Sequence, residues 1–364
     1  MSKRHCTVLG AGLIGRLLAW RLARAGHPVS VFEAGGPDAR SSAAHAAAAM
    51  LAPLAESAST EPAVVAMGHY GLQRWPRLLD DLRQPVYFQR EGTLILWHRQ
   101  DAAEATRFTG QLERMAATLA GSVRPVPVDA RQIAELEPAL ADRFPRGLLL
   151  PGEGHLDNRQ LLAALLFEME ALGVALHWHA PRMLDAFATQ HDTDGWVIDC
   201  RGIGAIAEWD GLRGVRGEIV RLFAPEVELR RPVRLLHPRY PLYIAPKPEH
   251  VFVVGASEIE SNDMSPVSVR TALELLGAAY SVHPAFAEAR ILELTAHCRP
   301  SLPDNLPAVR MIGKRVLQIN GLYRHGYLIA PALLEVALQI VADGHSELGI
   351  ALGLAMELEP SCAC

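Results

Sequence analysis

The sequence has few cysteines, and their spacing argues against two kinds of site. The five cysteines are scattered, apart from Cys362 and Cys364 at the C-terminus. This usage predicts reduced thiols in a cytoplasmic protein rather than a disulfide framework. No two cysteines have the two-residue spacing of a zinc knuckle, so we expect no bound metal.

Long basic runs, long apolar runs and a leader segment are also lacking. The formal net charge is −5 and no basic patch with interleaved aromatics is present, which argues against a nucleic-acid partner. No apolar run approaches the roughly 20 residues of a membrane span, and the first predicted strand starts too early to leave room for a signal peptide. With 50% hydrophobic and 21% charged residues, the 364-residue chain is predicted to be a cytoplasmic enzyme of two domains with a large core.

Residues 7–35 have the pattern of a nucleotide-binding βαβ unit. An apolar run at 7–9 predicts a strand, and helical periodicity at 16–25 predicts a helix that stops at Gly26, where a capping glycine is expected. A second alternating run at 29–32 predicts the next strand of a parallel sheet.

The turn between that strand and helix carries the glycine pattern of a dinucleotide site. Gly10 permits a tight turn, Gly12 lets the backbone approach a pyrophosphate, and Gly15 allows close packing of helix and strand. The helix N-terminus then offers free N–H groups to the phosphates. Glu33 is placed to accept both ribose hydroxyls of an adenosine, and its charge disfavours a 2′-phosphate, so NADP is not expected.

Periodicity predicts the remaining elements. Helices are predicted at residues 68–82, 102–119, 130–136, 158–172 and 268–279, and a last helix is predicted to begin near Pro331 and to run to 342, because proline suits a first helical turn. Strands are predicted at 86–97 (a pair around Gly92), 174–179, 196–200, 215–222, 242–245, 251–255, within 289–299 and at 316–320. The strands at 174–179 and 196–200 are expected in the nucleotide sheet, and those at 215–255 in an antiparallel sheet.

The order of these elements predicts a discontinuous nucleotide domain. We expect residues 1–86, 141–214 and 298–364 to form it. Residues 87–140 and 215–297 are expected to form a substrate domain on the antiparallel sheet.

The alanine-rich segment at residues 43–49 is open to two interpretations. Its composition is that of an ordinary alanine helix. Small side chains also let a backbone lie close to a flat cofactor, and the preceding Arg40, Ser41 and Ser42 could hold phosphate or ribose oxygens. The sequence alone does not decide between the two.

Two polar side chains in the second half of the chain suit recognition of a small carboxylate. Arg299 offers a bidentate guanidinium and Tyr243 a hydroxyl donor. The alternatives are a structural salt bridge for Arg299 and an interior Tyr243 that is bonded to backbone. The turn at residues 321–326, ahead of the last helix, is a second positive helix end. Such an end suits the pyrimidine edge of a flavin, where reduction builds negative charge.

Five segments of the chain resemble the D-amino-acid-oxidase-type flavoproteins, and within that family most of all the bacterial glycine oxidases of thiamine biosynthesis. They are residues 7–33, 47–53, 243–257, 299–304 and 321–331. The run Ala48-Ala49-Met50-Leu51-Ala52-Pro53 is typical of the family's loop under the flavin ring, and Tyr243-Ile244-Ala245-Pro246 is similar to its Tyr-Ile-Val-Pro strand. Arg299-Pro300 with Pro303-Asp304 matches its Arg-Pro-Gly-Thr-x-Asp segment. The run from Gly321 to Pro331 is similar to its Gly-His-Phe-Arg-Asn-Gly-Ile-Leu-Leu-Ala-Pro segment.

The resemblance implies a fold, a cofactor and site residues. The fold is of mixed α/β class, with a glutathione-reductase-like FAD-binding Rossmann domain and a substrate domain that has an antiparallel sheet. FAD is bound without a covalent link. Arg299 and Tyr243 hold the substrate carboxylate, and Arg324 acts on the substrate side. The implied FAD contacts are Gly10, Ala11, Gly12, Ile14, Gly15, Glu33, Arg40, Ser41, Ser42, Ala48, Ala49, Met50, Leu51, Arg182, Gly202, Tyr323, Arg324, His325, Gly326, Tyr327 and Leu328.

The sequence departs from the family pattern at Glu258 and at residues 199–202. Glu258 and Met50 are both expected in the substrate pocket, and Glu258 is an acid where the family has Met or Leu. The alternative is that Glu258 is a rim residue facing water. The run Asp199-Cys200-Arg201-Gly202 replaces an apolar run of small residues. Both departures leave the exact substrate open.

The implied reaction is oxidative deamination of glycine or a similar small amino acid or amine. The imino acid is hydrolysed to the oxo acid and ammonia, O₂ accepts the electrons and is released as H₂O₂, and the product feeds the thiazole of thiamine. One alternative is a secondary-amine or D-amino-acid dehydrogenase with another electron acceptor. A second is a flavoprotein without activity that serves as a binding or assembly module. Whether the chain forms a homo-oligomer is left open.

Overall fold

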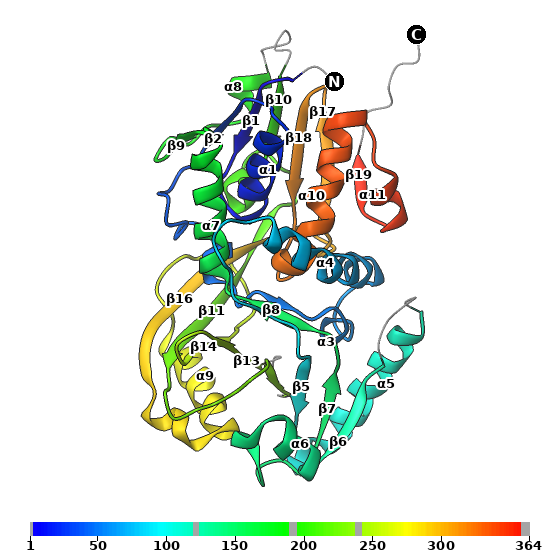
Figure 1. The fold of residues 1–364 in the computed structure, drawn as a ribbon, viewed down its shortest axis with the longest axis vertical. Helices are drawn as coiled ribbons and strands as arrows, with labels where there is room; N and C mark the ends of the chain where they lie inside the picture. The colour runs from blue at the N-terminus through cyan, green and yellow to red at the C-terminus, as the bar shows by residue number, and fades with distance from the viewer. Residues whose placement is uncertain (1–2, 119–123, 189–194, 237–241, 358–364) are drawn as a thin grey trace.

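Within the residues described, the chain has a mixed α/β fold with three β-sheets (Figure 1). The computed structural model describes residues 3–118, 124–188, 195–236 and 242–357, so the predictions for Cys362 and Cys364 lie outside it. A seven-stranded sheet lies in the upper half of Figure 1, and a nine-stranded sheet in the lower half. The long strands β11 (Arg213–Phe223) and β16 (Arg290–Ser301) run from the level of the upper half down into the lower sheet.

The seven-stranded sheet is built around the predicted βαβ unit. β1 (Cys6–Leu9) pairs in parallel with β2 (Val29–Phe32) and with β10 (Trp196–Asp199). The strand order is β19-β17-β18-β10-β1-β2-β9. The other members are β9 (Ala175–His177), β17 (Ala308–Ile312), β18 (Val316–Asn320) and β19 (Ala355–Glu357). Because β9 and β10 lie in this sheet, the prediction for residues 174–179 and 196–200 is confirmed.

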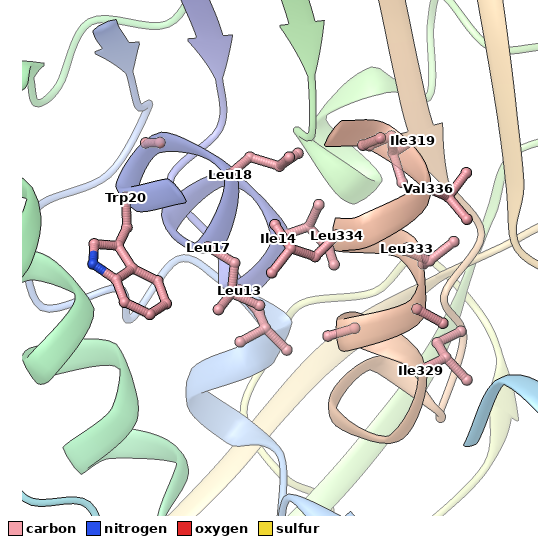
Figure 2. Close-up of a cluster of buried hydrophobic side chains, with 14 of the residues drawn as sticks. Leu13, Ile14, Leu17, Leu18, Trp20, Ile319, Ile329, Leu333, Leu334 and Val336 are labelled. Atoms are coloured by element: carbon pink, nitrogen blue, oxygen red, sulfur yellow. The ribbon is translucent and has the colours of Figure 1, made fainter. Parts of the chain in front are cut away.

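The core of this half is formed where α1 (Leu13–Arg24) packs against α10 (Gly326–Asp343). Figure 2 shows the apolar side chains that fill it, and each is at most 6% exposed: Leu13, Ile14, Leu17, Leu18 and Trp20 of α1, Ile319 of β18, and Ile329, Leu333, Leu334 and Val336 of α10. By length and composition alone α10 could cross a membrane, but 61% of it is buried inside the protein. Its apolar composition is therefore that of a core helix.

The prediction that the last helix begins near Pro331 is wrong, because α10 begins at Gly326 and contains Pro331 in its interior. Proline has no N–H to donate to the carbonyl of Tyr327, one turn earlier. Trp75 of α4 (Pro62–Asp80) supplies the missing donor, since its indole N–H donates to that carbonyl at 2.9 Å. A residue far away in the sequence thus lets the helix continue through proline.

The nine-stranded sheet has the order β15-β11-β14-β13-β12-β5-β7-β6, with β16 paired to β11. The strands not yet located are β5 (Thr93–Leu96), β6 (Val126–Asp129), β7 (Arg146–Leu150), β12 (Val233–Leu235), β13 (Leu242–Lys247), β14 (Val251–Gly255) and β15 (Ile259–Glu260). The pairs formed by β11, β13 and β14 with their neighbours are antiparallel, as predicted for residues 215–255. The domain boundaries drawn from the sequence stay a prediction.

Sequence patterns do not predict β6, β7 or β12. β6 contains Pro127, which cannot donate a ladder hydrogen bond. The strand tolerates this proline because, within the described ranges, it lies at the edge of the sheet with β7 as its one neighbour.

A three-stranded sheet of β3 (Met50–Leu51), β8 (Gly154–Leu156) and β4 (Phe88–Gln89) completes the strands. The alanine-rich segment forms a single helical turn, α2 (Ala43–Ala46), in which the Ser42 hydroxyl accepts the Ala44 N–H at 3.2 Å. The chain is extended at Ala47, and Ala49 has a φ of +53° just before β3. The alanine-helix interpretation therefore holds for that turn alone.

The helices at 102–119, 130–136, 158–172 and 268–279 are confirmed with small shifts at their ends, the position of residue 119 itself not being described. α4 begins at Pro62 rather than at 68. The remaining helices are α3 (Pro53–Glu56), α5 (Ala102–Thr118), α6 (Ala130–Leu136), α7 (Asn158–Ala171), α8 (Asp185–Ala188), α9 (Val269–Val282) and α11 (Glu347–Ala351).

The contact between α4 and α10 yields a stability prediction. A Cβ on Gly71 would lie 3.3 Å from Pro331 Cδ and would overlap the carbonyl of Leu328. We expect Gly71→Ala to lower the free energy of unfolding by about 1–3 kcal/mol, because the two helices would have to move apart. Urea denaturation of the purified variant measures this change.

The matched control is Gly277→Ala on α9, where no atom lies within 4 Å of the added carbon. This change should raise the free energy of unfolding by about 0.4–1 kcal/mol, because alanine restricts the unfolded chain. Equal stabilities of the two variants would show that close packing at Gly71 does not limit stability.

Candidate active site

One elongated cavity brings together most of the site residues predicted from the sequence. It is lined by the glycine turn after β1, the segment at residues 41–52, strands β11 and β16, and the turn that leads into α10. The predicted residues on its wall are Gly10, Gly12, Ile14, Glu33, Ser41, Ser42, Ala48, Ala49, Met50, Gly202, Tyr243, Glu258, Arg299, Tyr323, Arg324, His325, Gly326, Tyr327 and Leu328.

Five predicted residues lie off the cavity wall. The Arg40 side chain is 79% exposed and pairs with Asp38 at 3.1 Å. Arg182 is exposed and its guanidinium lies 5.1 Å from the Phe32 ring. The remaining three, Leu51, Gly15 and Ala11, support the wall from behind: Leu51 is fully buried, Gly15 packs against the Gly10 carbonyl, and Ala11 donates its N–H to Glu33.

The end of the cavity next to β1 fits the ribose and phosphates of a dinucleotide. Gly10 has a φ of +92°, and a Cβ there would lie 2.7 Å from the Cys200 carbonyl, so only glycine allows this close approach. No side chain caps the N-terminus of α1 at Gly12, which leaves its N–H groups for an anion.

Glu33 is held in place by backbone donors. Its Oε2 accepts the Ala11 N–H at 2.6 Å and its Oε1 accepts the Gly35 N–H at 2.7 Å. Since a carboxylate oxygen can accept more than one hydrogen bond, both oxygens retain capacity for ribose hydroxyls. The donor set and the glycine cradle therefore fit an adenine dinucleotide.

The other end of the cavity holds Arg299. Its Nη2 donates to the Ser257 carbonyl at 3.1 Å, whereas its Nη1 is buried and has no hydrogen-bond partner in the part of the chain that the structure describes. Burial lowers the pKa of Arg299, and Tyr243 opposes that shift; the guanidinium remains charged at neutral pH. No carboxylate of the described chain pairs with it, so the geometry does not support a structural salt bridge.

Two glycines make room for these side chains on the sheet. Val215 is the register partner of Arg299, and the guanidinium lies over Gly217, two residues along β11. Gly255 of β14 faces Tyr243 across the sheet, and a Cβ there would lie 2.6 Å from the phenolic oxygen. Burial raises the pKa of Tyr243, so its hydroxyl stays a donor at neutral pH.

Arg324, in contrast, has a carboxylate partner for each of its nitrogens. Nε and Nη2 donate to Glu56 at 2.8 and 2.6 Å, and Nη1 donates to Glu258 at 3.0 Å. Glu56 also accepts from Arg234 at 3.1 Å. Burial alone would raise the pKa of Glu56, but Arg324 and Arg234 outweigh it and lower that pKa to about 2.

Glu258 lies at the rim of this end. Its side chain is 41% exposed, yet it is ion-paired with Arg324 rather than free in water. Burial of Tyr323 and its hydrogen bond to Glu258 raise the pKa of the phenol. Burial lowers the pKa of His325 to about 4, so that imidazole is neutral.

Sequence reasoning missed two charged residues, the half-buried Glu56 and the buried Lys247. Glu56 ends the short helix α3, and the small and apolar residues around it in the sequence do not predict a network of charges. Lys247 donates from Nζ to the Ala48 carbonyl at 2.7 Å and to the Leu156 carbonyl at 2.6 Å, and so ties the cavity wall to β8. A signal existed for Lys247, since strand alternation places it on the same face as Tyr243.

Comparison with known proteins identifies relatives over nearly the whole chain. The family model for FAD dependent oxidoreductases (DAO) matches residues 5–337. A Rhizobium etli protein named "Putative thiamine biosynthesis oxidoreductase ThiO" is 42% identical over 337 residues, 92% of this chain and 96% of that protein. A glycine oxidase of Geobacillus kaustophilus is 27% identical over 356 residues, 91% of each chain. The resemblance stated from the sequence is confirmed.

A solved structure adds a likeness of fold. Iminodiacetate oxidase from Chelativorans sp. BNC1 superposes with a TM-score of 0.80 at 22% identity, over 97% of this chain and all of that one. The predicted fold class is thereby confirmed.

Lys247 makes the stability of the protein depend on pH. Burial lowers its pKa from 10.5 to about 7, so between these values the unfolded chain binds a proton that the folded chain does not. The contribution of Lys247 to the free energy of unfolding therefore rises with pH from about 7 toward 10. We expect Lys247→Met to weaken this rise, measured by urea denaturation at pH 7 and pH 9.

The exposed Lys314 offers a control on the same chain. Lys314→Met should retain the pH dependence of the unmodified protein. If Lys247→Met retained it as well, the pH dependence would arise from other groups.

Proposed function

Because the chain belongs to the family of FAD-dependent oxidoreductases, we propose that it oxidises glycine or a similar small amino acid with one carboxylate. The observation that carries this proposal is Arg299, which lines the cavity together with Tyr243 and whose buried Nη1 has no partner among the described residues. A guanidinium with an unused donor next to a phenol suits a bidentate, charge-assisted grip on a carboxylate.

The protein groups orient the substrate and need not act as a strong base. Arg299 and Tyr243 hold the carboxylate, and this fixes the Cα–H relative to the cavity wall at Ala48–Met50. Orientation of this kind is worth about 7–11 kcal/mol of the barrier. FAD supplies the acceptor for the hydride, and water then converts the imino acid to the oxo acid and ammonia.

The rest of the cavity would hold the cofactor. Glu33 and the N-terminus of α1 suit the adenosine and the pyrophosphate. The N-terminus of α10 has no side-chain cap and lies on the cavity wall, so its positive end would stabilise negative charge on a reduced ring. In this proposal O₂ is the acceptor, H₂O₂ is released, and the enzyme works in the cytoplasm. The name of the Rhizobium etli relative supports a place in thiamine biosynthesis.

We expect FAD to be held without a covalent bond and to depend on Glu33. Acid precipitation of the purified protein should release all of the yellow colour. Glu33→Ala should weaken FAD binding by about 1.5–3 kcal/mol, the range for a hydrogen bond to a charged group. Fluorescence titration of the apoprotein with FAD measures this loss. Colour retained in the pellet, or unchanged affinity in the variant, would contradict these expectations.

Arg299 tests the proposed reaction. Arg299→Ala should reduce kcat/KM for glycine, by an amount that corresponds to a loss of about 2–5 kcal/mol of transition-state binding, while FAD stays bound. Arg299→Lys should recover little of this activity, because lysine keeps the charge but cannot donate two parallel hydrogen bonds to a carboxylate. The measurement is H₂O₂ release with glycine.

Two comparisons separate this role from a structural one. A primary amine without a carboxylate should lose far less activity in the same variants. Arg290→Lys, an exposed change on the same strand, should leave both substrates unaffected. Equal losses for glycine and for the amine, together with a lowered Tm, would show that Arg299 supports the fold instead of the substrate.

A further inference from the structure

The charges at the substrate end of the cavity are almost, but not fully, paired. Each nitrogen of Arg324 donates to a carboxylate, two of them to Glu56 and Nη1 to Glu258. Arg299 has no carboxylate partner among the described residues and retains an unused Nη1. Both guanidiniums line the cavity, yet only Arg299 has a nitrogen without any hydrogen-bond partner among the described residues.

The partners of Arg324 differ in how firmly they are held. Glu56 is 18% exposed and is shared with the buried Arg234, so it belongs to the interior. Glu258 is 41% exposed and is joined to the site through Arg324 and Tyr323. Glu258 is therefore the group at the cavity rim that occupies the Arg324 donor nearest to solvent.

We propose that Glu258 restricts the enzyme to substrates with a single carboxylate, by occupying Arg324 and by placing a negative charge at the rim. This inference rests on the proposed function, since it assigns the first carboxylate to Arg299. A second carboxylate on the substrate would meet the charge of Glu258 and a guanidinium whose three nitrogens each already donate to a carboxylate. Discrimination then comes from the unfavourable encounter with the wrong ligand, not from an extra contact with the right one.

Removal of the charge should open a second anion subsite on Arg324. Glu258→Gln keeps the length of the side chain and an oxygen that can accept from Arg324, so the fold and bound FAD should persist. The net charge at this end becomes more positive by one unit. A neutral amide oxygen binds Arg324 Nη1 less strongly than a carboxylate does, so a ligand carboxylate can displace it.

The test uses acetate and malonate as probes with one and two carboxylates. Each is titrated without oxygen into the FAD-loaded protein, and the flavin absorbance reports binding without turnover. In Glu258→Gln, the ratio of the malonate Kd to the acetate Kd should fall at least about tenfold from that of the unmodified enzyme. The variant lacks the repulsive charge of Glu258, and its Arg324 Nη1 no longer donates to a carboxylate of the protein. An unchanged ratio would overturn the proposal.

Two variants serve as controls. Glu258→Asp keeps the charge and should stay close to the original ratio. Glu260→Gln removes an acid that is 67% exposed, pairs with Arg213 at 3.1 Å and does not line the cavity, so the ratio should not move. An equal fall in Glu260→Gln would show a general charge effect and would also overturn the proposal.

The outcome can be separated from that of the proposed function. Glycine oxidation by the unmodified enzyme tests the reaction, whereas the two titrations test the number of carboxylates that the site accepts. Absence of glycine turnover together with the expected fall in the ratio would reject glycine as substrate and keep the role of Glu258. Glycine turnover with an unchanged ratio would support glycine as a substrate and reject the proposed role of Glu258.

Discussion

The antiparallel pairing of β11 with β16 is the constraint on which the substrate end of the cavity depends. Its register sets Val215 opposite Arg299, which lets the guanidinium lie over Gly217 on the cavity side of the sheet. The next pairings, of β14 with β11 and with β13, bring Gly255 under the Tyr243 ring on the same side. A slip by one residue would turn these side chains to the opposite face. Backbone hydrogen bonds thus position the site before any ligand arrives.

The cavity surrounds its ligands with buried charges that have nearly all been neutralised. Glu56 lies between Arg234 and Arg324, and Lys247 donates to two carbonyls. Desolvating such groups is costly, and their mutual hydrogen bonds offset most of that cost. Among the described residues, Arg234 and Arg299 each have one buried nitrogen without a hydrogen-bond partner, and of these two residues only Arg299 lines the cavity. An unmet donor on the cavity wall favours binding of an anion at that point.

Local sequence patterns predicted the parts of the fold that depend on neighbouring residues. The glycine turn with Glu33 and the strands at 29–32 and 251–255 follow from turn chemistry and periodicity, and the structure contains them. The start of α10 could not be predicted in this way, because Trp75 compensates for Pro331 from a distant helix. The role of Glu56 was hidden for the same reason, since its partners come from remote segments. Arg40 and Arg182 were predicted as cofactor contacts from their position in the sequence, yet neither lines the cavity: Arg40 pairs with Asp38 and Arg182 lies over the Phe32 ring.

The placement of α10 has a consequence for how long the protein survives. One helix both lines the cavity and fills the core against α1. A cofactor that binds only the folded chain lowers the population of the unfolded chain by mass action. Proteases attack the opened chain and not the closed one. Bound flavin therefore protects the folded chain against proteolysis in addition to supplying its chemistry.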